Sequence, residues 1–101
     1  MLICLIEEPA KQPQQELEDC LAALAAGETD AMEPLYRIAN PAVYAFALSL
    51  LKSAHDAEDV AQDCFVRIFQ AAPDYRPMGK PMAWILTIAR NLCLQKLRQG
   101  K

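Results

Sequence analysis

The last third of the chain, residues 81–98, carries the pattern of one long helix, and this pattern constrains the fold more than any other feature. Pro81 suits the first turn of a helix, where its missing N–H is not needed. The seventeen positions that follow contain no Gly or Pro, and Gly100 stands where a helix stop is expected. At about 100° per residue, the apolar arc of this helix comprises Ile85, Ile88, Ala89, Leu92, Cys93 and Leu97. The opposite arc comprises Trp84, Thr87, Asn91, Gln95 and Arg98. Trp84 is its unusual member, because the rest of that arc is polar.

Helical spacing of apolar residues also runs through the earlier part of the chain, and no stretch alternates in the manner of a strand. Four helices are expected before the last one. The first covers residues 15–26, and the second runs from a cap at Thr29-Asp30 to a break at Asn40-Pro41. The third covers residues 42–52 and the fourth residues 54–71. The stretch 42–52 is apolar on nearly every side, which is typical of a helix in the middle of a bundle. The sequence therefore predicts an all-α, compact bundle of four to five helices over residues 15–101, preceded by a flexible N-terminal arm over residues 1–14.

Composition argues against several classes of protein. At 101 residues the chain is one small domain, and no nucleophile–base pair or Gly-rich phosphate loop points to an enzyme. Four widely spaced cysteines and a single histidine, His55, predict neither a metal site nor a cofactor. Cys20, Cys64 and Cys93 fall at apolar helical positions, which indicates buried thiols in a reducing compartment. No segment approaches the roughly 20 apolar residues that cross a bilayer, and residues 1–6 lack the basic start of a signal peptide, so a cytoplasmic protein is expected.

An acidic stripe marks the helix expected over residues 54–71. Ser53 and Asp56 form a capping-box pattern before the apolar run. The expected core stripe comprises Val60, Ala61, Cys64, Phe65, Ile68 and Phe69. The opposite side comprises Asp56, Glu58, Asp59, Gln62 and Asp63. Acids in the first turn interact favourably with the positive end of the helix dipole, but this interaction no longer acts at Asp63, nearly two turns into the helix. With few cations to pair with, the stripe is either a docking face for a basic partner or a plain solvated face.

Charge is divided unevenly along the chain. Residues 76–101 contain six bases and no acid, whereas the other 75 residues contain 4 bases and 13 acids, so the two parts carry +6 and −9. The loop 73–80 leads Tyr75, Arg76 and Lys80 directly into the basic helix. An aromatic ring and two cations at a helix N-terminus suit a nucleotide. An ordinary loop with Tyr75 packed on the bundle, followed by a solvated helix, fits the same residues.

Three pieces of the sequence occur in the order and spacing of one known family. They are DAEDVAQDCF at residues 56–65, the Tyr75-Arg76-Pro77 loop, and AWILTIARNLCLQKLR at residues 83–98. With these pieces the chain resembles the region 2 domain of a bacterial sigma factor of the sigma-70 family, in the extracytoplasmic-function (ECF) group. The resemblance covers about residues 21–98, which is most of the chain.

The resemblance implies a role for each charged surface. In such factors the helix similar to residues 56–70 docks on the clamp helices of the β′ subunit of core RNA polymerase, which carry arginines. The implied polymerase-binding residues are Asp56, Glu58, Asp59, Gln62 and Asp63. The loop and last helix of the family engage the promoter −10 element on the non-template strand and hold the DNA open. The implied DNA-binding residues are Tyr75, Arg76, Lys80, Trp84, Thr87, Arg90, Asn91 and Arg98. The family also admits an anti-sigma factor as a further partner.

Two features qualify the resemblance. A complete ECF factor has a second, helix-turn-helix domain for the −35 element, and this sequence ends at Lys101, where the linker to it would begin. The chain alone is therefore not expected to select a full promoter. Cys64 also replaces the Thr or Val usual before the Phe of its motif. The alternative to a DNA-binding sigma domain is a sigma-like interaction module that docks through the acidic stripe without binding DNA.

Overall fold

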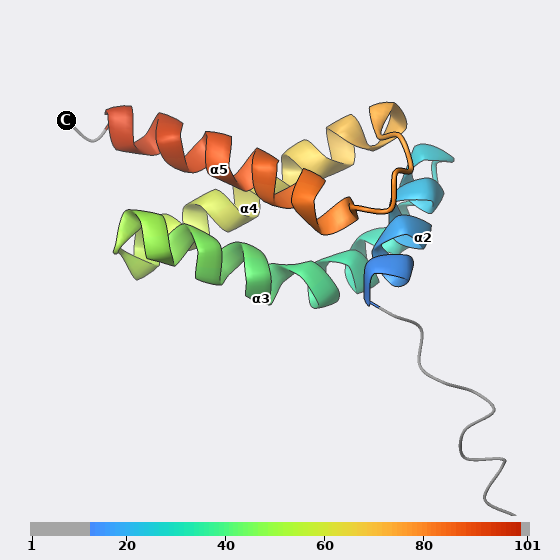
Figure 1. The fold of residues 1–101 in the computed structure, drawn as a ribbon, viewed down its shortest axis with the longest axis horizontal. Coiled ribbons are helices and arrows are strands. Elements are labelled where there is room, and N and C mark those ends of the chain that lie inside the picture. Colours follow the sequence, from blue (N-terminus) through green and yellow to red (C-terminus); the bar gives the residue numbers. More distant parts are fainter. Residues whose placement is uncertain (1–12, 100–101) are drawn as a thin grey trace, which may run out of the picture.

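The computed structural model describes residues 13–99, and in this part of the chain all regular structure is helical (Figure 1). The α-helices are α2 (Pro13–Ala25), α3 (Met32–Leu51), α4 (Ala54–Ala71) and α5 (Pro81–Gln99), with short 3₁₀ turns η1 (Thr29–Ala31) and η2 (Ala72–Asp74). Helices α3, α4 and α5 pack against one another, and α2 lies across one end of this group, against α3, α5 and η2 (Figure 1). The predicted all-α bundle is confirmed. None of the described helices is both long and apolar enough to span a bilayer.

Helix α2 begins two residues earlier than the sequence pattern predicts. Pro13 and Gln14, which were assigned to the flexible arm, form its first turn, a position that proline tolerates because its missing N–H would have no partner there. Residues 1–12 of the predicted arm lie outside the described part. The helix buries Leu17, Cys20, Leu21 and Leu24 against the bundle. It ends before Gly27, whose φ of 93° is a conformation that residues with a Cβ rarely adopt.

Helix α3 is continuous through Pro41, so the predicted break at Asn40-Pro41 is wrong. A proline inside a helix removes one backbone hydrogen bond and costs about 3 kcal/mol. Four residues spaced one turn apart along α3, on both sides of the proline, are completely buried: Leu35, Ala39, Val43 and Ala47. Burial of this unbroken stripe offsets the cost of the proline. Helix α3 contacts α2, α4 and α5, which is the central position expected for its apolar second half.

The predicted cap at Thr29-Asp30 is also wrong. These residues form the 3₁₀ turn η1, and α3 starts at Met32 with Ala31 as its N-cap and no side-chain cap bond. The turn supplies the first backbone bonds of the connection, since the Ala31 N–H donates to the Glu28 carbonyl at 3.1 Å. A side-chain cap is therefore replaced by a backbone turn.

Helix α4 begins as predicted at the Ser53 cap, where the Asp56 N–H donates to Ser53 Oγ at 3.2 Å. Its buried stripe is Val60, Ala61, Cys64, Phe65 and Ile68, together with Ala57. Phe69 was predicted to belong to this stripe but is 45% exposed. Ile68, in the same turn, is fully buried, so Phe69 lies at the border of the buried stripe and not within it.

Helix α5 begins at Pro81 as predicted and buries Ile85, Ala89, Leu92 and Cys93. Leu97, predicted on the same arc, is 42% exposed near the end of the helix. Cys64 of α4 donates its S–H to the Ile85 carbonyl of α5 at 3.8 Å. Burial raises the pKa of Cys64 to about 12, with a smaller contribution from Cys93, so Cys64 is a neutral core thiol at physiological pH. The predicted burial of Cys20, Cys64 and Cys93 is confirmed.

Candidate functional site

The predicted polymerase-binding residues share one side of α4 but divide into two flanks. We name the set Asp56, Glu58, Asp59, Gln62 and Asp63 the acidic face of α4. Glu58, Gln62 and Asp63 are exposed, whereas Asp56 and Asp59 are partly covered. Asp63 lines a groove toward α5, while Glu58 and Gln62 line a groove toward α3. The helix therefore places carboxylates along both of its borders.

Lys96 of α5 changes the electrostatics expected for this face. Its Nζ lies 3.5 Å from Asp59 Oδ2 and 4.0 Å from Asp56 Oδ1. His55 Nε2 lies 3.6 Å from the same Asp59 oxygen. The expectation of few nearby cations is therefore wrong for the first turns of α4, because a lysine 37 residues later in the chain returns to them. Glu58 and Asp63 make no ion pair within the described residues.

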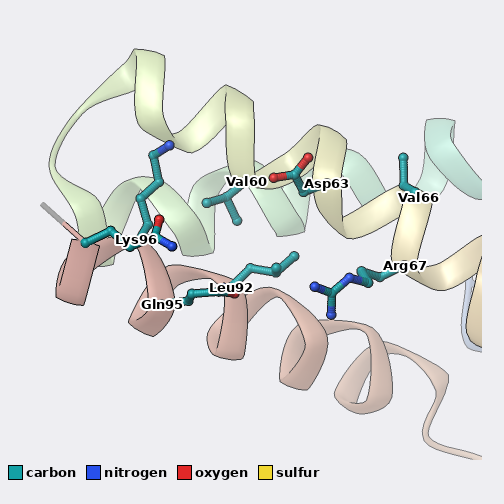
Figure 2. Close-up of a pocket in the computed structure, with 8 residues that line it drawn as sticks. Val60, Asp63, Val66, Arg67, Leu92, Gln95 and Lys96 are labelled. Carbon is teal, nitrogen blue, oxygen red and sulfur yellow. The ribbon is translucent and has the colours of Figure 1, made fainter.

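The groove between α4 and α5 begins at this lysine (Figure 2). It is lined by Val60, Asp63, Val66, Arg67, Leu92, Gln95, Lys96 and Gln99. Figure 2 shows Lys96 extending from α5 toward the start of α4, and Arg67 extending from α4 toward α5. Asp63 thus lies along one helix between two cationic side chains, with Val60 and Leu92 forming the apolar floor.

Two exposed apolar residues extend the outer face of α4, and the sequence reasoning missed both as surface residues. Val66 is 56% exposed and Phe69 is 45% exposed. They follow Asp59 and Gln62 by seven residues each, a spacing that returns to the same side of a helix. The seven-residue spacing was the sequence signal that could have placed Val66 and Phe69 on the exposed side of the helix. The outer face of α4 therefore carries its acids in the first half and two exposed apolar residues, beside the polar Gln70, in the second.

The predicted DNA-binding residues gather mainly in a second groove, at the loop that precedes α5. This groove of about 410 Å³ is lined by Asp74, Tyr75, Arg76, Met78, Lys80, Ala83, Trp84 and Thr87. It brings together five of the eight predicted residues, from the loop and from the first two turns of α5. Arg76, Met78 and Lys80 are exposed, so the groove offers cations and apolar surface together. Asp74 adds one acid to this otherwise basic site.

Trp84 is half-buried and not fully open as its place on the polar arc predicted. Its ring packs on that of Tyr75, with centroids 4.8 Å apart and planes tilted by 57°. Tyr75 also packs against the core, as the alternative of an ordinary loop expected, and its predicted contact with DNA remains a prediction. The Tyr75 hydroxyl is buried without a hydrogen bond of ordinary geometry. Burial and the neighbouring Glu18 carboxylate raise the pKa of Tyr75.

Helix α2 holds the loop in place, a function that no sequence pattern indicated. Glu18 Oε2 accepts a 2.8 Å hydrogen bond from the Gly79 N–H, and Gln14 Oε1 accepts a 3.3 Å bond from the Met82 N–H in the first turn of α5. Gly79 has a φ of 77°, so a side chain at this position would be strained. These bonds connect residues 61 and 68 positions apart, which explains why local patterns could not reveal them.

The remaining predicted DNA-binding residues lie farther along α5. Asn91 lines a separate shallow groove with Arg67, Gln70 and Ile88. Arg90 and Arg98 are exposed and line none of these grooves. The Thr87 hydroxyl donates to the Ala83 carbonyl at 2.8 Å, so this donor is already used within the helix. Among the described residues, no cluster of His, Cys, Asp and Glu has the arrangement of a metal site.

Comparison of the sequence with known proteins finds similarity to one family. The family model for Sigma-70 region 2 matches residues 35–101. The ECF RNA polymerase sigma factor SigK of Mycobacterium sp. (strain KMS) is 28% identical over 96 residues, covering 92% of this chain and 50% of the relative. SigW of Bacillus subtilis (strain 168) is 29% identical over 75 residues, covering 74% and 40%.

A third ECF factor, SigE of Mycolicibacterium smegmatis, is 33% identical over 91 residues, covering 87% of this chain and 35% of the relative. The chain thus spans about half the length or less of these relatives. No solved structure shows significant similarity to it.

Proposed function

The chain belongs to the sigma-70 region 2 family, in its ECF group, and on that premise we propose that it acts in transcription initiation. In this proposal it is a binding domain that attaches to core RNA polymerase and engages the promoter −10 element. The observation that carries the proposal is the separation of two charged surfaces: the acidic face of α4, and the cationic groove formed by the loop and the start of α5. Each surface has the sign that its proposed partner requires.

The acidic face of α4 is proposed to dock on the arginine-bearing clamp helices of the β′ subunit. Its carboxylates provide long-range attraction and orientation, which for exposed charges affect the association rate more than the affinity. Val66 and Phe69 provide apolar area beside them. Removal of such apolar surface from water favours association. The acidic and apolar halves of α4 therefore supply complementary parts of one interface.

The cationic groove is proposed to bind the non-template strand of the −10 element. Arg76 and Lys80 lie beside the aromatic pair of Tyr75 and Trp84, so a phosphate and a base can be bound within one groove. Stacking of an unpaired base on an aromatic ring contributes roughly 1–3 kcal/mol. The contact between Trp84 and Tyr75 covers part of both rings. Only the open edge and face of Trp84 are therefore offered to a base.

Binding, and not bond making, performs this function, in keeping with a family that is not enzymatic. The strand that is opened is stabilised by the groove, and the polymerase holds the domain at the site of opening. Arg90 and Arg98 extend the cationic surface along α5, and they and Asn91 are proposed to contact the DNA backbone. Each contact of an arginine with a phosphate steepens the dependence of DNA affinity on salt.

The first experiment is association with core RNA polymerase, measured by fluorescence anisotropy. The double reversal Asp59→Arg with Asp63→Arg is expected to abolish binding. Because Asp59 lies 3.5 Å from Lys96, this reversal also brings two cations together. The neutral pair Asp59→Asn with Asp63→Asn avoids that repulsion and is expected to weaken binding.

The matched control is Glu28→Arg with Asp30→Arg, the same charge change on the exposed connection between α2 and α3. This control is expected to bind as wild type does. The docking assignment is contradicted if both double variants, with arginine or with asparagine at positions 59 and 63, bind polymerase with the affinity of the wild type. Polymerase binding without preference for single-stranded −10 DNA over scrambled or duplex DNA identifies the alternative, an interaction module that does not bind DNA.

A further inference from the structure

Backbone hydrogen bonds fix the two ends of the loop that supplies the cationic groove. The Tyr75 N–H donates to the Ala72 carbonyl at 3.0 Å, and the Trp84 N–H donates to the Lys80 carbonyl at 3.2 Å. Residues 76–80, which lie between these bonds, are all exposed. An exposed loop buries few apolar contacts, so its conformation is well defined only where another element holds it.

Helix α2 provides a carboxylate for the middle of this loop. Glu18 Oε2 accepts the 2.8 Å hydrogen bond from the Gly79 N–H. Leu17 and Leu21, which precede and follow Glu18 on the helix, are completely buried. The helix also contacts η2 and α5, the two elements that flank the loop (Figure 1). The exposed part of the loop is therefore bonded to an acceptor on a helix that is anchored in the core.

The same carboxylate lies near the first residue of the loop. The Tyr75 hydroxyl is buried, and after burial the Glu18 carboxylate is the main cause of the raised pKa of Tyr75. A carboxylate has this effect only when it is close to the hydroxyl. The Tyr75 ring in turn packs on the Trp84 ring, with centroids 4.8 Å apart. One side chain of α2 thus lies beside both the Gly79 backbone and the residue that supports Trp84.

We infer that Glu18 is a positioning residue for the cationic groove: it holds the loop so that the two cations of the groove lie beside the pair of Tyr75 and Trp84. The inference rests on the DNA binding proposed above and adds to it a residue that does not line the groove. A loop that is ordered before its ligand arrives loses less conformational entropy on binding. Glu18 thereby strengthens the binding of single-stranded DNA, although its own charge repels phosphates.

The sign of the effect distinguishes positioning from simple electrostatics. Glu18→Ala and Glu18→Gln remove the same negative charge, which by itself tightens the binding of DNA to both variants alike. Glutamine keeps an oxygen that can accept from the Gly79 N–H, and alanine does not. At low salt, Glu18→Ala is expected to bind a short, labelled single-stranded oligonucleotide of mixed sequence about five- to tenfold more weakly than Glu18→Gln, because a hydrogen bond that orders the loop is lost.

Glu16→Gln is the matched control. Glu16 lies two positions earlier on α2, about 200° around the helix from Glu18, so its loss removes the same charge on the opposite side. This control is expected to bind the oligonucleotide as the wild type does. Binding to core RNA polymerase through α4 is expected to be unchanged in all three variants, and thermal unfolding shows whether each is folded.

Trp84 supplies an independent readout, because it is the only tryptophan in the chain. Without DNA, acrylamide is expected to quench its fluorescence more strongly in Glu18→Ala than in the wild type or Glu18→Gln, since the contact of Tyr75 with Trp84 loosens when the loop is released. Equal quenching in the wild type and Glu18→Ala overturns the inference. Equal affinity of Glu18→Ala and Glu18→Gln for the oligonucleotide also overturns it, because charge alone then accounts for the effect.

Two further outcomes separate this inference from the proposed function. If the wild type does not bind the oligonucleotide, the proposed DNA binding fails; stronger quenching in Glu18→Ala then leaves Glu18 a role in ordering the loop and removes its role in DNA binding. If Glu18→Ala loses polymerase binding as well as oligonucleotide binding, the substitution acts on the whole domain, and the positioning role is wrong.

Discussion

Replacement of Lys96 by methionine is expected to leave the fold nearly as stable and to strengthen binding to core RNA polymerase. Lys96 Nζ lies 3.5 Å from Asp59 and 4.0 Å from Asp56. In water, unit charges at these distances attract by about 1.2 and 1.0 kcal/mol. The three side chains are 34–44% exposed, so solvent screening and side-chain entropy reduce the net value to about 0.5 kcal/mol. Methionine keeps most of the aliphatic length of lysine and compensates part of this loss.

The effect on binding has the opposite sign. If the proposed docking is right, a cation of the partner has to share Asp56 and Asp59 with Lys96 in the wild-type domain, and the methionine variant removes this competition. A gain of about 0.5 kcal/mol corresponds to a two- to threefold tighter complex at low salt. The gain is expected to shrink at 1 M salt, where the Debye length falls to about 3 Å.

Fluorescence anisotropy of the labelled domain with core polymerase, at low and high salt, measures this change. The variant also lowers the net charge by one, which by itself favours a basic partner. Arg98→Met is the matched control, since it removes one exposed charge from the same helix without touching α4. Weaker binding by Lys96→Met, or equal gains for both variants, would refute the competition.

Three further predictions concern the cap, the core thiol and the aromatic pair. Ser53→Ala removes the cap bond to the Asp56 N–H and should lower the free energy of unfolding by about 1 kcal/mol, measured by urea denaturation; an unchanged midpoint would contradict the cap. Because the pKa of Cys64 rises from 9.0 to about 12 on folding, its contribution to stability should be complete below pH 9 and fall by up to about 1.4 kcal/mol per pH unit between pH 9 and 12. Cys64→Ala should lack that part of the pH slope, and identical slopes would refute it. Trp84→Ala should weaken binding of the polymerase complex to single-stranded −10 DNA by about 1–3 kcal/mol, whereas Trp84→Phe should retain part of the affinity; equal losses on scrambled and duplex DNA would assign Trp84 a structural role only.

Local patterns predicted the parts of the fold that depend on one helix at a time. The Ser53 cap, the buried stripe of α4 and the start of α5 at Pro81 each arise from residues of a single helix or its cap. The prediction failed at Pro41, where the local cost of a proline competes with burial of residues on both sides of it. Helix propensity alone does not include the free energy of burial that offsets the proline in α3.

The candidate site was predictable in composition but not in assembly. The Tyr75, Arg76, Lys80, Trp84 and Thr87 side chains are close in sequence, and the structure brings all five into one groove. Lys96 was counted only as part of a basic segment, because its pairing with Asp59 depends on how α4 and α5 are aligned. The bonds from Gln14 and Glu18 to the loop depend likewise on the placement of α2. Contacts between helices were therefore the missing information.

The alignment of α4 and α5 also bears on how a chain of net charge −3 can carry the cationic groove that is proposed to bind DNA. The two helices bury their apolar faces together, with Cys64 bonded to the Ile85 carbonyl between them. Apart from the pairing of Lys96 with Asp56 and Asp59, the two helices leave most of their charged residues exposed. Charges separated by more than about 10 Å are largely screened at ordinary ionic strength. The carboxylates of α4 lie in its first three turns, whereas Arg76 and Lys80 follow the end of this helix, so screening limits their effect on the field around the two cations. It is the sign of each exposed face, and not the sum over the chain, that determines which partner the face can bind.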